Sequence, residues 1–398
     1  KAGLNPKPLS KSESIKQIMN TTIERTAGNL QNLCMTTANT AQTQFYNAIN
    51  SAYMFTSTGV KSYTQAILDE IKNISKQGAI IQYPSGARRS VESAVRTNIV
   101  TAINQNCGKL QELRADELGW DLMELTAHSG ARPEHARWQG KIVSRSGKKG
   151  YLSFRDIGYG EATGFKGVNC RHDWYPYYLG STKTYTQEQL NAWKNEKVEY
   201  NRKKISKYEE IQRRMEREIR NDKKQLAGLQ GILKSNINDN KLILETKTNF
   251  AKRSLIYKTH QNELDDFIKQ TSLVKDNSRL YIGNQDKNIS TQIANVTKIA
   301  NKYNNSDIIG TKVNGVKITE IGEHIISRTY ARNVTFEDVQ DTLKNPIGYG
   351  TIKEDSKGRK SFYVHGKNIT IAVNPETGKL ATVRQTSRRE KKKYGVEE

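Results

Sequence analysis

The sequence predicts an α+β protein of several domains, and three observations support that class. Its 398 residues leave room for two or three domains. Only 35% of the residues are hydrophobic and the mean hydropathy is −0.77, so we expect part of the chain to form extended helix, linker or tail. Stretches with apolar residues at helical spacing alternate with segments rich in glycine, aromatic residues and turn signals, which are typical of short strands.

Residues 1–115 are predicted to be a helical docking region. Apolar residues recur at three-to-four spacing in three segments, which begin near Ser12, Tyr63 and Val91. Gly78 follows the second segment and is expected to be its C-cap. Because no catalytic pattern lies in these helices, we expect them to pack on one another or on a partner.

Residues 116–182 are predicted to form a compact α+β core module. Glycine and aromatic residues become dense there, and short strands with tight turns fit that composition better than helices do. Residues 183–235 return to a charged helical pattern and predict a helical arm, with Thr186 and Gln189 as an N-terminal capping box. The arm carries a narrow apolar seam at coiled-coil-like spacing: Ile205, Tyr208, Ile211, Met215, Ile219, Leu226, Leu229 and Leu233.

The C-terminal part of the chain is predicted to contain a spacer, a small domain and a tail. Residues 236–307 are polar and weakly periodic, so we expect a partly ordered spacer. Residues 308–387 are predicted to be an α+β domain that begins with a hairpin around Asn314-Gly315. Its helices are expected at 320–332 and, N-capped by Thr335, at 335–343, and its strands at 350–353, 360–365, 368–374 and 380–385. Residues 388–398 are expected to be a disordered basic tail.

The charge balance indicates an anionic partner. Lys and Arg outnumber Asp and Glu by 64 to 41, so the formal net charge is +23. This excess favours nucleic acid over an anionic membrane surface, and lysines that merely solvate helices are the alternative. No run of about 18 apolar residues occurs, so we expect no membrane span. Helix-turn-helix, zinc-finger and phosphate-loop patterns are missing, which disfavours a base-reading regulator and an ATP-driven motor.

Cysteine usage indicates a reducing compartment during assembly. Cys34, Cys107 and Cys170 lie far apart and are odd in number, which argues against a disulfide framework. We expect no cofactor, because no dinucleotide fingerprint is present. The chain begins with Lys1 rather than Met, so we expect that the start of the gene product is missing or processed.

The stretch HSGARPEHARWQGK at residues 128–141 concentrates unusual chemistry, and GVNCRH follows at residues 167–172. Taken alone, His128, His135, Cys170 and His172 can supply four zinc ligands. Their spacing matches no common zinc module, so the sequence favours side chains that hydrogen-bond within a glycine-rich core and hold its turns. Ten residues make up this structural motif: His128, Gly130, Arg132, His135, Trp138, Gly140, Asn169, Cys170, Arg171 and His172.

Together with Tyr83-Pro84-Ser85-Gly86 and Ser90-Val91-Glu92, these segments resemble the phage minor capsid protein 2 family. That family is related to the head-morphogenesis proteins typified by protein F of phage Mu, and the resemblance covers residues 57–180. Relatives often end this module with Cys-Arg-Cys, whereas this chain has Cys170-Arg171-His172, so the resemblance does not imply a shared metal role. No catalytic residue is carried over, because the resemblance is to structural proteins.

The resemblance implies a minor virion component inside the head, at or near the portal. Such a protein is assembled in the cytoplasm of the host bacterium and helps head morphogenesis or delivery of DNA. Its implied partners are the portal, other capsid proteins and packaged double-stranded DNA. Phosphate contacts by Lys and Arg need no base readout, so they suit that DNA partner.

One helical face of the C-terminal domain carries a residue set suited to RNA cleavage. His324, Arg328 and Arg332 stand at i, i+4 and i+8. The imidazole can move a proton to or from the 2′-hydroxyl or leaving oxygen, while the arginines stabilise the anionic transition state. Further side chains on the strands are candidates to complete this site: Thr382, Thr386, Ser387, Tyr363 and His365.

Residues 308–387 also resemble the phage-associated, metal-independent nucleases of the barnase, EndoU, colicin and RelE-like class. The resemblance implies a virion-carried effector that cuts host RNA, and the alternative is a domain that only binds DNA or packs in the head. It rests on the helical face just described, Asn345-Pro346, Asn374-Pro375, Thr377-Gly378 and the terminal Thr-Ser. The catalytic residues it implies are His324, Arg328, Arg332, Thr386 and Ser387.

Overall fold

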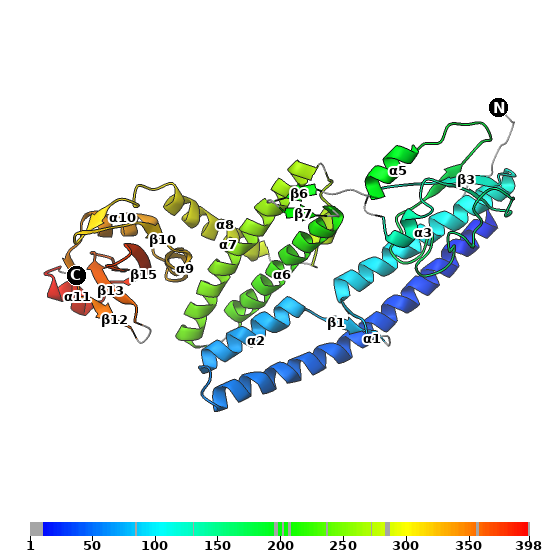
Figure 1. The fold of residues 1–398 in the computed structure, drawn as a ribbon. Coiled ribbons are helices and arrows are strands. Elements are labelled where there is room, and N and C mark those ends of the chain that lie inside the picture. The colour runs from blue at the N-terminus through cyan, green and yellow to red at the C-terminus, as the bar shows by residue number, and fades with distance from the viewer. Residues whose placement is uncertain are drawn as a thin grey trace. The chain divides into compact units, whose positions relative to one another are not determined.

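The protein is described by a computed structural model, and its architecture is mixed α and β, with long helices and small sheets (Figure 1). This composition agrees with the predicted α+β class. The structure describes residues 11–83, 86–129, 131–194, 198–200, 203–205, 208–235, 238–271, 273–282, 287–355 and 358–396.

Two compact units make up the chain, and each unit is built from two separate stretches of sequence. Unit 1 comprises residues 1–45 and 78–214, and unit 2 comprises residues 46–77 and 215–398. These limits do not follow the predicted boundaries at residues 115 and 235. The reason is that helices distant in sequence, rather than neighbouring segments, share a core.

Unit 1 begins with α1 (Glu13–Ser57), which ends in unit 2. The hairpin of β1 (Ile80–Gln82) and β2 (Arg88–Ser90) leads into α3 (Val91–Glu117), which confirms the helix predicted from Val91. Ser90 caps α3 by accepting a hydrogen bond from the backbone of Ser93. Three buried residues join these elements: Leu33, Ile81 and Ala94.

The core module of unit 1 contains a three-stranded antiparallel sheet in the order β4-β3-β5. Its strands are β3 (Leu122–Leu125), β4 (Ile142–Ser144) and β5 (Trp174–Pro176), and the short helix α4 (Pro133–Ala136) lies between the first two in sequence. The chain from β4 to β5 is mostly turns, and close backbone approach there requires glycine. A Cβ atom on Gly164 would lie 1.9 Å from the carbonyl oxygen of Gly158.

The predicted charged arm is not one continuous helix. Thr186 and Gln189 form the predicted capping box at the start of α5 (Gln187–Lys194). A hairpin of β6 (Val198–Tyr200) and β7 (Lys203–Ile205) then precedes α6 (Tyr208–Lys234), so Ile205 lies on a strand rather than on the predicted helical seam. The seam itself is buried at Ile211, Met215, Ile219, Leu226 and Leu229, and Ile232 replaces Leu233 as its last buried residue.

The predicted polar spacer is wrong for most of residues 236–307, because two helices form there. These are α7 (Asn240–Thr271) and α8 (Lys287–Asn304), with the 3-10 turn η2 (Asn277–Leu280) between them. Their apolar residues form narrow buried stripes among Asn, Lys and Thr, so the composition hides the helices. With α2 (Tyr63–Gln77) and α6 they enclose one core of unit 2: Leu68, Leu226, Leu229, Ile232, Leu242, Phe250, Ile289 and Ile293.

The C-terminal domain of unit 2 is built on a sheet in the order β10-β15-β14-β13-β11. The pairing of β10 with β15 is parallel, the other pairings are antiparallel, and β12 also pairs with β13. The strands are β10 (Glu320–Ile321), β11 (Gly348–Tyr349), β12 (Lys353–Glu354), β13 (Lys360–His365), β14 (Ile369–Val373) and β15 (Lys379–Gln385). The helices are α9 (Glu323–Ala331), α10 (Phe336–Lys344) and α11 (Arg388–Lys393).

Several local predictions in this domain are confirmed. The hairpin of β8 (Lys312–Val313) and β9 (Val316–Lys317) turns at Asn314 and Gly315, which both have positive φ as a type I′ turn requires. Thr335 caps α10. The strand predicted at 350–353 is wrong, because β11 ends before it and β12 begins at its last residue.

The segment predicted as a disordered tail also forms structure, since α11 begins at Arg388 with Ser387 as its N-cap. The run of basic residues predicts disorder there. A capping box formed by Ser387 and Glu390, and the bond from Arg384 of the sheet to Glu390, hold the helix instead.

Helix α8 is an integral part of the C-terminal core. Its residues Ala300 and Tyr303 join the buried cluster formed by α9, α10 and one face of the sheet. The Tyr303 hydroxyl also lies 2.8 Å from the hydroxyl of Thr329 on α9.

Among the helices that the structure describes, none has the length and apolar character needed to cross a membrane.

The role of α8 can be tested at Tyr303. Because this ring is almost fully buried, Tyr303→Ala is expected to lower the free energy of unfolding by about 3–5 kcal/mol. Tyr303→Phe removes only the bond to Thr329 and should cost about 1 kcal/mol. Urea unfolding followed by circular dichroism measures both values. The exposed neighbour Asn304→Ala is the control, and equal stability of all three variants would contradict a core role for α8.

Candidate functional site

The C-terminal sheet has a core face and a polar face. Side chains alternate along a strand, so the residues that flank each core position point the other way. The register pairs His365 with Thr370 and Thr370 with Arg384, which places these three side chains in a row across β13, β14 and β15. Tyr363 lies on the same side of β13, and the Arg384 guanidinium stands 5.2 Å from the centre of its ring. We call Tyr363, His365, Thr370 and Arg384 the polar sheet face.

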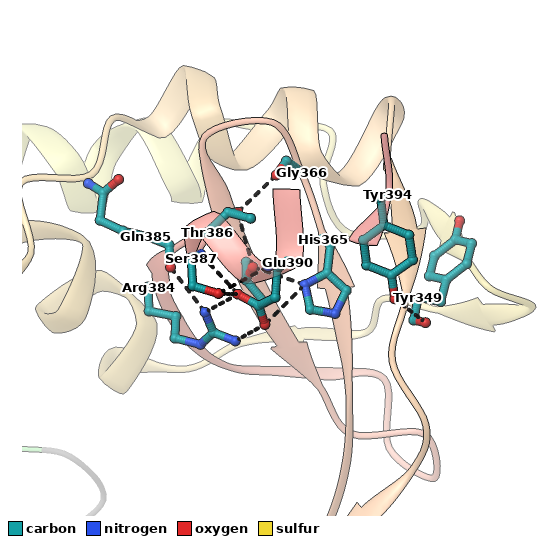
Figure 2. Close-up of polar contacts among 10 residues, drawn as sticks. Tyr349, His365, Gly366, Arg384, Gln385, Thr386, Ser387, Glu390 and Tyr394 are labelled. Atoms are coloured by element: carbon teal, nitrogen blue, oxygen red, sulfur yellow. Dashed lines mark hydrogen bonds and ion pairs between the residues drawn. The ribbon is translucent and has the colours of Figure 1, made fainter. Parts of the chain in front are cut away.

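A chain of hydrogen bonds fixes the tautomer of His365 (Figure 2). The Thr386 hydroxyl donates to the carbonyl oxygen of Gly366 at 2.8 Å, so the Thr370 hydroxyl, 3.1 Å away, donates to Thr386. Thr370 therefore accepts from His365, whose Nδ1 lies 3.1 Å from its oxygen. With the proton on Nδ1, the Nε2 atom of His365 carries the lone pair.

Arg384 and Glu390 form a bidentate ion pair on this face (Figure 2). The same carboxylate accepts bonds from the Ser387 backbone at 2.9 Å and from the Ser387 hydroxyl at 2.7 Å, which completes the capping box of α11. The hydrogen bond from Arg384, and next those from Ser387, lower the pKa of Glu390 to about 2. The ion pair thus fastens α11 to β15.

Helix α11 and the residue after it cover His365. The Tyr394 ring lies 5.1 Å from the imidazole, and its hydroxyl donates to the carbonyl oxygen of Tyr349 at 2.9 Å (Figure 2). Gly348 makes room for that ring, since a Cβ atom there would lie 2.2 Å from it. His365 is therefore only 5% exposed, and burial lowers its pKa.

The predicted catalytic face lies on α9 and its C-terminal cap, and the structure brings its three residues together. We call His324, Arg328 and Arg332 the α9 face. Arg328 forms an ion pair with Glu245 of α7 at 2.7 Å, and Arg332 donates to the carbonyl oxygen of Val383. The Nε and Nη1 atoms of Arg328 are buried without a hydrogen-bond partner. Burial, and next the charges of Lys252 and Arg328, lower the pKa of His324 to about 4.

Thr386 and Ser387, which were predicted to complete the catalytic site, make structural contacts. Thr386 is buried and holds Thr370, while Ser387 caps α11. Among the described residues, no hydrogen bond joins either of them to the α9 face. Sequence reasoning missed Arg384 and Glu390, although Ser387 followed three residues later by Glu390 is a capping-box signal.

The motif of the core module in unit 1 gathers around one buried cluster. His135, Cys170 and His172 are each about 2% exposed or less, and Trp138 packs against both histidines. Burial lowers the pKa of both histidines, that of His172 to about 2, and raises the pKa of the Cys170 thiol. His128 stacks on His172 with ring centres 4.4 Å apart.

The other motif residues shape the chain around that cluster. Arg132 donates to the carbonyl oxygen of Val168, and Gly140 and Asn169 adopt positive φ at turns. Arg171 instead points outward and pairs with Glu209 at 3.3 Å. Gly130 lies outside the described residues.

Comparison with known proteins places the chain in a family. Residues 1–269 match the family model described as phage minor capsid protein 2. A structural protein of Lactococcus phage LL-H is 28% identical over 289 residues, which cover 67% of this chain and 72% of that relative. No solved structure matches the chain. The family match extends beyond residues 57–180, which carry the resemblance in the sequence, but it ends before the C-terminal domain. The chain therefore belongs to the phage minor capsid protein 2 family, whose members are structural proteins of the virion.

Proposed function

We propose that this protein is a minor head component inside the capsid, at or near the portal, where it contacts packaged DNA and helps head morphogenesis or DNA delivery. Family membership supports a role in the virion with other virion proteins as partners. The net charge of +23 supports the contact with DNA, because phosphate contacts by Lys and Arg are independent of base sequence.

The observation that carries the docking role is an apolar patch on α1, formed by Tyr46, Ile49 and Tyr53. These residues stand at i, i+3 and i+7, so they share one face of the helix. Their exposed fractions are 57%, 49% and 72%. Large apolar side chains gathered on one exposed face mark a protein interaction site. For a capsid protein, we infer that the portal covers this patch.

Docking through the α1 patch can be tested in assembled particles. The pair Ile49→Asp and Tyr53→Asp places two charges in an apolar contact, which is expected to cost about 2 kcal/mol or more of binding free energy. The amount of this chain in purified, DNA-filled virions should fall several-fold, as measured by quantitative mass spectrometry.

Asn47→Asp adds a charge to the same helix outside the patch and should leave incorporation unchanged. Absence of the wild-type chain from filled virions would contradict the head role itself. Cross-links from wild-type virions that join the patch to a protein other than the portal would contradict the portal assignment alone.

Contact with DNA predicts strong salt dependence. Full-length protein should bind duplexes of different sequence equally, with a logarithmic slope of about −0.9 per phosphate contact. Fluorescence anisotropy at several salt concentrations measures this slope. If binding is missing at low salt, or if affinity is the same at low and high salt, the positive charge serves another purpose.

A second function, metal-independent RNA cleavage, is favoured by the α9 face. Arg328 has two buried donors without partners, and such donors suit a phosphate group. Burial, and next the charges of Arg328 and Arg384, lower the pKa of Arg332, so positive charge is concentrated around this face. A neutral His324 beside these cations can accept a proton from a ribose 2′-hydroxyl.

The role of His324 can be tested with the full chain and single-stranded or transfer RNA. His324→Ala is expected to reduce cleavage about 10²- to 10⁴-fold, because it removes the general base. The control Glu323→Gln changes the exposed neighbouring residue and should leave RNA cleavage unchanged. Since the pKa of His324 is about 4, the imidazole loses its lone pair only below that value, so wild-type activity should fall as the pH drops through 4 rather than through 6.5.

Two results would limit this second function. RNA that stays intact after long incubation with folded protein would exclude it. Loss of activity in His365→Asn but not in His324→Ala would move the catalytic role from the α9 face to the polar sheet face.

A further inference from the structure

The buried cluster of the core module has no part in the functions proposed above, yet its atoms are arranged for a ligand. His135 comes from α4, whereas Cys170 and His172 precede β5. One donor atom from each residue lies within 4.8 Å of the other two, and all three side chains are buried. We call these three residues the buried triad.

Hydrogen bonds fix which nitrogen of each histidine points into the triad. Nε2 of His135 donates to the carbonyl oxygen of Thr163 at 2.7 Å. Nε2 of His172 lies 3.1 Å from Oε1 of Gln139, and that oxygen also accepts from the backbone N–H of His128, which fixes the orientation of the amide. The Nε2 atoms of both histidines are therefore donors. In the neutral rings both Nδ1 atoms then carry lone pairs.

The two lone pairs face each other without enough hydrogens between them. The Nδ1 atoms of His135 and His172 are 3.3 Å apart, and Sγ of Cys170 is 3.8 Å from Nδ1 of His172. The single S–H of a thiol can donate to only one of the two nitrogens. Three electron-pair donors thus converge on a buried point that lacks a matching number of protons, and a cation resolves that conflict.

Two of the three donor spacings are close to those of tetrahedral zinc, and the third, between Nδ1 of His135 and Sγ of Cys170, is within 4.8 Å. With Zn–N and Zn–S bonds of about 2.0–2.1 and 2.3 Å, two ligand nitrogens stand about 3.3 Å apart and a nitrogen and a sulfur about 3.6 Å apart. The observed distances are 3.3 and 3.8 Å. The bonds to Thr163 and Gln139 are the outer-shell contacts that usually orient ligating histidines.

Two nearby cationic side chains, Lys166 and Arg132, repel a metal ion, but both are held by hydrogen bonds to other groups. Lys166 pairs with Asp173 at 2.8 Å and with Asn104 at 2.9 Å, while Arg132 donates to the carbonyl oxygen of Val168. Deprotonation of Cys170 supplies a negative charge that compensates part of the added charge. His128 stacks on His172 and its buried Nε2 has no hydrogen-bond partner, but the ligand atoms that the structure gathers come from His135, Cys170 and His172.

We propose that His135, Cys170 and His172 bind one Zn²⁺ ion, which joins α4 to the segment before β5 in the core module. On binding, Zn²⁺ forms a bond to each Nδ1 and to Sγ, and the thiol proton of Cys170 is released to solvent. The ion is structural, because a buried site with protein ligands leaves no access for a substrate.

Cobalt substitution tests the site in the full chain. Purified protein stripped with a chelator should bind one equivalent of Co²⁺ and show a thiolate-to-cobalt charge-transfer band with tetrahedral d–d bands, which one equivalent of Zn²⁺ abolishes. Cys34 and Cys107 are exposed, so Cys34→Ser with Cys107→Ser should retain the full signal. Cys170→Ser, which is nearly isosteric, should lose the charge-transfer band.

A variant of a residue that orients a ligand tests whether the triad binds a metal ion or only packs in the core. Gln139→Ala removes the hydrogen-bond acceptor of His172 Nε2 and of the His128 backbone N–H but no metal ligand. It is expected to weaken metal affinity about 10- to 100-fold while one ion still binds at saturation. Circular dichroism confirms that each variant is folded. The proposal is overturned if the folded Cys34→Ser, Cys107→Ser protein shows no thiolate band with excess Co²⁺, or if Cys170→Ser retains that band.

Discussion

Burying a polar side chain costs free energy unless that side chain has a hydrogen-bond or ion-pair partner. This constraint governs both the polar sheet face of the C-terminal domain and the buried triad of the core module. With only 35% hydrophobic residues, the chain builds several small cores rather than one large core. Polar groups at the edges of these cores must then pair with one another. In the C-terminal domain Arg384 and Glu390 do so, and in the core module the two inward histidine nitrogens and Cys170 are left facing each other.

The family match covers one part of the chain and leaves the C-terminal domain outside it. Residues 1–269 carry the family assignment and include the core module with its buried cluster. The C-terminal domain lies beyond that match, but it is not detached, because Tyr303 of α8 enters its core and Glu245 of α7 pairs with Arg328. Any chemistry on the α9 face is therefore held by helices that belong to the rest of unit 2.

Predictions from sequence were most accurate where a feature depends on neighbouring residues. The Asn314-Gly315 turn, the Thr335 cap and the Thr186 and Gln189 capping box all involve atoms a few residues apart, and all were found. Prediction failed for residues 236–307, because scattered apolar residues there become a core only when α6, α7 and α8 pack together. The pairing of Arg384 with Glu390 was also missed, because Arg384 lies on β15 and Glu390 on α11, and only tertiary packing brings these two elements together.

By itself, the sequence determined the short-range turns and helix caps, the strong positive charge, the absence of a long apolar run and the motif that resembles minor capsid proteins. Only the tertiary structure decided which side chains meet. The spacing of His135 and Cys170 along the chain matched no zinc module, yet the turns between β4 and β5 return the chain until Cys170 and His172 lie beside His135. The physical reason is that the distance between such residues depends on loop closure and on packing around Trp138, neither of which is encoded by residue spacing.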